Sequence, residues 1–96
     1  MSSIGDSVGT LAAVNPGGTL VIRPSGSLEV TIHNFYYSGS VDIYYVCAGN
    51  QVKLAWDVEE GSLQGFWHAS QAHYFLMVNP TQSTLYYGYD GIVTKV

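Results

Sequence analysis

The chain has 96 residues, which is enough for one domain with one hydrophobic core. Hydrophobic residues make up 47% of it and charged residues only 10%, against roughly 25% in an average soluble domain, so neutral polar side chains must cover much of the surface. The formal net charge is -4, and Arg23, Lys53 and Lys95 are too scattered to form a nucleic-acid interface that neutralises phosphates.

The beginning of the chain shows no targeting segment. Residues 1–6 contain no basic region followed by an apolar run, and no stretch approaches the roughly 20 apolar residues of a membrane span. We therefore expect a protein without a signal peptide or a transmembrane segment, either cytoplasmic or secreted without a leader. The single Cys47 cannot form an intramolecular disulfide, and its strand parity predicts a buried thiol.

Short strands separated by turns are predicted for the first third of the chain. Residues 7–14 are mostly apolar without a strict period and end at Asn15-Pro16-Gly17-Gly18, which predicts an edge strand or a loosely packed arm followed by a turn. Residues 19–23 form a β-branched run, and residues 28–34 alternate between apolar and polar side chains. We expect these two segments to pair as a hairpin.

Residues 39–58 show the strongest pattern and predict a β-hairpin at the centre of the fold. Each strand alternates, and Gly49-Asn50 between the strands supplies turn residues. The parity expected to face the core comprises Val41, Ile43, Tyr45 and Cys47 in the first strand, and Val52, Leu54 and Trp56 in the second.

The remaining segments continue the series of short strands. We expect strands at residues 63–69, 73–79, 84–89 and 92–96, the last two separated by a turn at Asp90-Gly91. Turn residues recur every eight to twelve positions or so, and no helical period is convincing. The sequence therefore predicts one domain over residues 1–96, an all-β antiparallel sandwich of seven or eight strands. A small closed barrel is the alternative.

Several short motifs resemble the C-terminal two-thirds of the aegerolysin family. In order, they are Gly39-Ser40-Val41-Asp42-Ile43-Tyr44, Leu54-Ala55-Trp56-Asp57, Gly61-Ser62 leading to Trp67, and Tyr74 before a late glycine-rich turn. Aegerolysins are small, acidic, leaderless β-sandwich proteins that associate with particular membrane lipids, sometimes with a partner protein that completes a pore. The resemblance implies a lipid-binding sandwich.

No catalytic, metal or nucleotide motif stands out. His33, His68 and His73 lack the spacing that directs two imidazoles at one ion, and no serine occupies a nucleophile elbow. We therefore expect no enzyme activity, no cofactor and no metal. The acidic turn of Asp57, Glu59 and Glu60 either binds Ca²⁺ or is a solvated turn, and we favour the solvated turn.

Aromatic residues make up 14% of the chain and are the part of its composition that says most about function. Trp56, Tyr45, Tyr74 and Phe75 have parity or surroundings typical of a core. Six other rings lie in or beside predicted turns, where some should be exposed: Tyr36, Tyr37, Trp67, Tyr86, Tyr87 and Tyr89. Exposed rings with nearby polar groups are typical of sites for neutral ligands. The predicted ligand-binding residues are Tyr36, Tyr37, Trp67, His68, Asn79, Tyr86, Tyr87, Tyr89 and Asp90.

The function predicted from these residues is non-enzymatic and lectin-like. We expect recognition of neutral glycans or glycolipid head groups by the exposed rings, in a homo-oligomer that gains avidity from several weak sites. The alternatives, in falling order, are an aegerolysin-like membrane-lipid binder, a self-assembling structural subunit and a small hydrolase.

Overall fold

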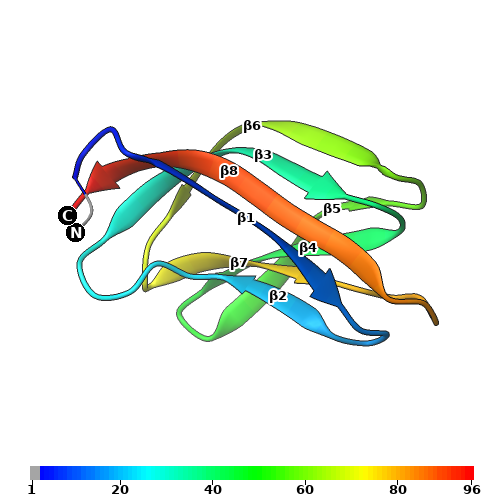
Figure 1. Ribbon diagram of the computed structural model, residues 1–96. Coiled ribbons are helices and arrows are strands. Elements are labelled where there is room, and N and C mark those ends of the chain that lie inside the picture. Colours follow the sequence, from blue (N-terminus) through cyan, green and yellow to red (C-terminus); the bar gives the residue numbers. More distant parts are fainter. Residues whose placement is uncertain (1–2) are drawn as a thin grey trace.

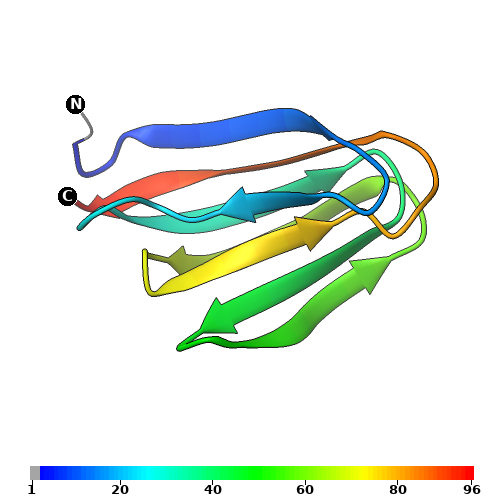
Figure 2. The ribbon, with the colours of Figure 1, turned by 90° about the horizontal axis from the view of Figure 1, so that it is seen from below.

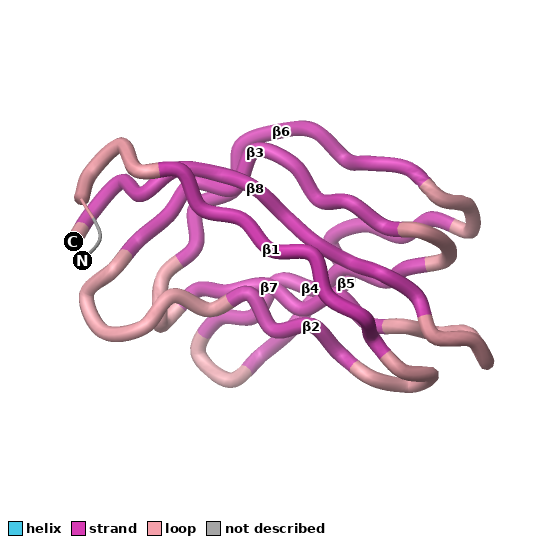
Figure 3. The backbone as a smooth tube through the Cα atoms, in the orientation of Figure 1, coloured by secondary structure: helices cyan, strands magenta, loops and turns pink. Residues whose placement is uncertain are grey.

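A computed structural model describes residues 3–96, and within this range the chain forms strands and no helix. Eight strands pack as two layers, with loops at both ends of the sandwich (Figures 1 and 3). The strands are β1 (Ser7–Val14), β2 (Thr19–Ile22), β3 (Glu29–Tyr37), β4 (Val41–Cys47), β5 (Asn50–Asp57), β6 (Gly61–Ala69), β7 (His73–Val78) and β8 (Leu85–Lys95). Within residues 3–96 no helix has the length and apolar character needed to cross a membrane.

Each layer is a four-stranded antiparallel sheet. Sheet A has the order β1-β8-β3-β6, and sheet B has the order β2-β7-β4-β5. β4 pairs with β5, β3 with β6, β2 with β7 and β1 with β8, so the chain resembles one long hairpin rolled into two layers, which is the jelly-roll arrangement. The predicted antiparallel sandwich is confirmed, and the two sheets do not close into a barrel.

The core lies between the sheets and uses side chains from both. All of its members are apolar or aromatic, and burial of this surface is the main stabilising contribution to the fold. Phe35 lies at its centre, with its ring 4.8 Å from the Trp67 ring and 5.8 Å from the Phe75 ring, measured between centroids. The buried residues are Val14, Ile22, Val30, Ile32, Phe35, Tyr37, Val41, Ile43, Ala69, Phe75, Met77, Tyr87 and Val93.

One predicted pairing and one predicted turn are wrong. Residues 19–23 do not pair with residues 28–34, because β2 lies in sheet B beside β7 whereas β3 lies in sheet A. Asp90-Gly91 is not a turn, because β8 continues through it. Gly91 lies close to β3, where a Cβ atom at that position would strike the Thr31 carbonyl oxygen, so this glycine reflects a close approach of two strands.

The β4–β5 hairpin is confirmed, but part of its predicted inward parity is wrong. Ala48 and Gly49 form its tight turn with positive φ angles of 52° and 80°. A register shift follows Ile43, since Ile43 pairs with Ala55 but Tyr44 pairs with Lys53. The extra residue in β5 reverses the parity beyond it. Ala55 therefore packs against the core, and Trp56 is exposed.

Three further residues of this hairpin differ from expectation. Val52 and Leu54 are exposed, because both belong to the edge strand β5 and Leu54 is the residue left without a partner at the register shift. Cys47 is half-buried where a buried thiol was predicted, because it lies in the last pair before the turn. Of the other rings assigned to the core, Phe75 is buried, whereas Tyr45 and Tyr74 are only half-buried.

Trp56→Ala is expected to change the free energy of unfolding by less than about 1 kcal/mol, because 67% of the Trp56 surface is exposed and little apolar contact is lost. The core position predicted from the sequence would instead imply a loss of about 3–5 kcal/mol. Urea denaturation of the variant distinguishes these values. A loss above about 3 kcal/mol would show that Trp56 is enclosed in solution.

Candidate functional site

An open hollow lies on the outer face of sheet A, the face turned away from sheet B. It has a volume of about 530 Å³ and is lined by residues of β3 and β6: His33, Asn34, Gln64, Gly65 and Phe66. Small-molecule sites are typically concave, with apolar walls and a few fixed polar groups, and hollows of this size suit them. We therefore take the hollow and the residues beside it as the candidate site.

A register shift between β3 and β6 shapes this hollow. Ile32 pairs with Trp67 and Asn34 pairs with Gln64, so His33 alone lies opposite two residues, Gly65 and Phe66. Such irregularities bend the strands and redirect side chains. Gly65 has no room for a side chain, because a Cβ atom there would lie 2.8 Å from the Trp67 ring beneath.

Asp90 supplies a fixed carboxylate next to the hollow. It lies in β8, where its backbone pairs with that of Asn34. The Asn34 amide Nδ2 donates to Asp90 Oδ1 at 2.8 Å, and the Tyr36 hydroxyl donates to Asp90 Oδ2 at 2.6 Å. Each carboxylate oxygen is thus held by one donor and retains further capacity to accept a hydrogen bond.

Asp90 remains charged over a wide pH range. The hydrogen bonds from Tyr36 and Asn34, in that order, lower the pKa of Asp90, and His33 lowers it further. The same contact with Asp90 raises the pKa of Tyr36. Within residues 3–96 the ion pairs are Lys53–Asp42, His68–Glu29 and Lys95–Glu29, so no described lysine or arginine forms an ion pair with Asp90.

Phe66 supplies the apolar part of the hollow. Its side chain is 83% exposed, the largest value among the exposed apolar side chains of the described residues. His33 packs against it edge to face, with centroids 5.3 Å apart and an angle of 80° between the rings. That contact holds the Phe66 ring beside the polar groups and leaves most of its surface open to a ligand.

Four of the nine predicted ligand residues lie on this outer face. Tyr36 and Asp90 belong to the polar cluster described above. His68 lies further along β6, where its Nε2 is 2.8 Å from Glu29 Oε1. Tyr86 lies on β8 and is 54% exposed.

The other five predicted residues lie elsewhere. Tyr37, Trp67, Tyr87 and Tyr89 point toward the core, because they have the inward parity of their strands, whereas the sequence had placed them in or beside turns. Their predicted exposure is wrong for Tyr37 and Tyr87, which are buried, while Trp67 and Tyr89 are half-buried. Asn79 is fully buried.

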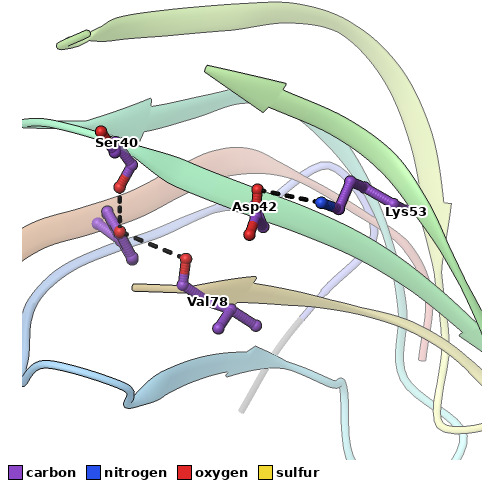
Figure 4. A network of polar contacts seen from close by, with 5 residues as sticks. Ser40, Asp42, Lys53 and Val78 are labelled. Atoms are coloured by element: carbon purple, nitrogen blue, oxygen red, sulfur yellow. Dashed lines mark hydrogen bonds and ion pairs between the residues drawn. The ribbon is translucent and has the colours of Figure 1, made fainter. Parts of the chain in front are cut away.

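The polar groups of the buried residues are engaged inside the protein. Asn79 Nδ2 donates to the carbonyls of Val14 and Ser83, and its Oδ1 accepts from Thr81, so its amide ties three segments together. The Tyr87 hydroxyl donates to the Ser40 carbonyl and contacts the Val78 carbonyl at 3.4 Å (Figure 4). Burial raises the pKa of Tyr87 to about 12, with a smaller contribution from the charge of Asp42.

In the acidic turn after β5, the Asp57 carboxylate binds backbone groups of the turn itself. Asp57 Oδ1 accepts from the backbone N–H groups of Val58 and Glu59, and Oδ2 accepts from the Tyr37 hydroxyl at 2.9 Å. The Tyr37 hydrogen bond is the largest cause of the lowered pKa of Asp57. Within the part of the chain that the structure describes, no group of three or more His, Cys, Asp or Glu side chains is placed to hold a metal ion.

Sequence reasoning missed the residues that line the hollow. Alternation in residues 28–34 places His33 outward, and alternation in residues 63–69 places Gln64 and Phe66 together on one face, so both patterns contained a usable signal. The position of Asn34 could not be predicted from alternation, because the register shift after Ile32 puts this residue on the outer face. In comparisons with known proteins, no family model matches the chain, and no curated protein matches it.

Proposed function

We propose that this protein binds neutral glycans, or the sugar head groups of glycolipids, at the hollow on the outer face of sheet A, without catalysing a reaction. The observation that carries the proposal is that the fixed Asp90 carboxylate on β8 and the exposed Phe66 ring on β6 flank β3 on the same face of sheet A. A sugar presents hydroxyl groups on its rim and C–H groups on its faces, so it requires both kinds of surface side by side.

The roles of the side chains follow from their chemistry. Asp90 accepts hydrogen bonds from sugar hydroxyls, and Gln64 offers an amide that both donates and accepts. The Phe66 ring packs against the apolar face of the sugar ring. Because Tyr36 and Asn34 already hold Asp90, the carboxylate needs little reorganisation on binding.

Charge favours a neutral ligand over an anionic one. Asp90 forms no ion pair with a lysine or arginine among the described residues, and the chain carries a formal net charge of -4. A sialylated or phosphorylated sugar would bring a second negative charge toward this carboxylate, which is unfavourable. We also propose that the protein works as a homo-oligomer, since several weak sites on one particle bind a glycan-covered surface with higher avidity.

A membrane-lipid surface is the second candidate partner. Five of the exposed apolar side chains lie close together in the sequence, on β5, β6 and the turn between them: Val52, Leu54, Trp56, Val58 and Phe66. Exposed apolar residues gathered in this way favour contact with another surface. This candidate also agrees with the resemblance to aegerolysins.

Parallel binding assays separate these functions. The protein is applied to immobilised neutral and sialylated glycans, to sphingomyelin vesicles and to phosphatidylcholine vesicles. Retention on neutral glycans supports the proposal, whereas binding only to sphingomyelin vesicles would replace it with the lipid-binding function. If the protein binds in none of the four assays and light scattering shows a large stable oligomer, a structural subunit would be favoured.

Glycan binding should be constant from neutral pH to about pH 5 and should be lost only below about pH 4. The pKa of Asp90 lies below the ordinary aspartate value of about 3.9, so the charged form persists until the pH falls through that lowered pKa. The hydrogen bonds to the Asp90 carboxylate follow the same dependence: any stability that they contribute to the fold is present above the ordinary aspartate pKa and is lost as the pH falls through the lowered pKa. Calorimetric titrations at several pH values, with circular dichroism as the folding control, measure this. A loss centred near pH 6.5 would assign binding to a histidine.

A further inference from the structure

The strand β1 is an edge of sheet A that lacks the usual protection against pairing with another chain. Edge strands are commonly protected by short length, by charged residues, by proline or by bulges. β2 has only four residues, β5 has a register shift and contains Lys53, and β6 has a register shift and contains His68. β1 has eight residues, an unbroken register with β8, no charged side chain and no proline.

The backbone groups of β1 alternate in direction. The Val93 N–H donates to the Asp6 carbonyl at 2.9 Å and the Val93 carbonyl accepts from the Gly5 N–H at 2.8 Å, so the backbone groups of Val93 face the β1 side of β8. In an antiparallel ladder this direction alternates, so along the continuous register Val8, Thr10, Ala12 and Val14 bond to β8. The N–H and C=O groups of Ser7, Gly9, Leu11 and Ala13 therefore point away from β8, toward the outside of the sheet.

We propose that β1 pairs antiparallel with β1 of a second copy, about a two-fold axis at Leu11. In this register Leu11 lies opposite Leu11 of the second copy, Gly9 lies opposite Ala13, and Ser7 lies opposite Asn15. Ser7, Gly9, Leu11 and Ala13 share the parity whose backbone groups point outward, so within β1 the backbone hydrogen bonds and the facing of side chains agree on one register.

The side chains on this edge fit the same register. Leu11 is 68% exposed, and the pairing covers it with its own copy on the outer face of the sheet. Gly9 and Ala13 beside it are small and allow the two leucines to meet. The nearest charge, Asp6, lies opposite Pro16, so no two carboxylates are opposed at the interface. This self-complementary surface is what a two-fold interface requires.

The edge is accessible. Figure 2 shows β1, in blue, as the outermost strand on its side of the molecule, with β2 of the other sheet further from that edge. Pairing would join the two copies of sheet A into one sheet of eight strands. Both hollows would then open on the same face of that sheet. This bivalent presentation rests on the proposed function, whereas the dimer itself does not.

Sedimentation and light scattering of the full chain test the interface over a wide range of concentration. The wild type should have twice the mass of one chain, and Leu11→Lys should halve that mass, because two ammonium groups would meet at the axis. Val21→Lys is the matched control, since Val21 is also exposed on an edge strand, and it should remain a dimer. A wild type that is monomeric at every concentration, an open-ended polymer, or a Leu11→Lys dimer would overturn the proposal.

Cysteine cross-linking in a Cys47→Ser background tests the register without depending on dissociation. Leu11→Cys should form a disulfide-linked dimer on mild oxidation, because the Cα atoms of a hydrogen-bonded pair lie about 5.5 Å apart, within the range that a disulfide spans. Ala13→Cys should not, because the two introduced thiols would be about four residues apart along the strands, roughly 13 Å. Cross-linking of Ala13→Cys in place of Leu11→Cys would contradict the axis at Leu11. Glycan binding plays no part in either measurement, so failure of this proposal is distinguishable from failure of the proposed function.

Discussion

Tyr87→Ala is expected to lower the free energy of unfolding by about 3–5 kcal/mol, a large part of the stability of a domain this small. Tyr87 is fully buried, so the substitution leaves a cavity between the sheets. It also removes the hydroxyl that donates to the Ser40 carbonyl, which then loses its partner inside the protein. This expectation reverses the one that follows from placing Tyr87 beside a turn, where little change in Tm would result.

Tyr86→Ala is the matched control, because Tyr86 precedes Tyr87 in β8 and is 54% exposed on the outer face. Its free energy of unfolding should change by less than about 1 kcal/mol. Chemical denaturation of both variants gives the comparison. Equal and small effects at the two positions would show that the Tyr87 side chain is not enclosed between the sheets while that of Tyr86 faces outward.

Asp90→Ala is expected to weaken binding of a neutral glycan roughly 10- to 100-fold, the equivalent of losing hydrogen bonds to a charged group, about 1.5–3 kcal/mol. The variant removes the acceptor that the proposal assigns to sugar hydroxyls. It also releases Tyr36 and Asn34, whose side chains are otherwise held beside the hollow. The measurement is calorimetric or surface-based titration with a glycan that the wild type retains.

Glu59→Ala controls for net charge, since it removes one carboxylate from an exposed turn outside the hollow. This variant should bind the glycan as the wild type does. If both variants lose affinity equally, the effect comes from net charge. If Asp90→Ala binds normally with an intact fold, the ligand contacts another surface.

Much of the fold was predictable because strand parity is a local property. The period of two in residues 39–58 identified the central hairpin, and the apolar residues of segment 7–14, followed by turn residues, pointed to an edge strand. The pairing of β2 was not predictable in this way, because neighbours in a rolled hairpin lie far apart in the sequence. Trp56 was misplaced because one extra residue in β5 reverses the parity, and no turn residue marks that position.

The candidate site was only partly predictable for the same reason. Tyr36 and Asp90 were selected as residues near turns, yet both lie within strands, where alternation decides their exposure. Tyr86 and Tyr87 show the consequence. They are adjacent and of the same residue type, yet their side chains lie on opposite faces of sheet A. The contact between Asn34 and Asp90 joins residues 56 positions apart in the sequence, and only the pairing of β3 with β8 brings them together.

The most direct measurement of the central claim is a titration of isotopically labelled protein with a neutral glycan, followed by backbone amide chemical shifts. If the hollow binds the sugar, the largest shifts will fall on Asn34, Gln64, Phe66 and Asp90, and the amides of sheet B will change little. Shifts concentrated on sheet B or on the loop around Asn79, with none at these four residues, would contradict the account.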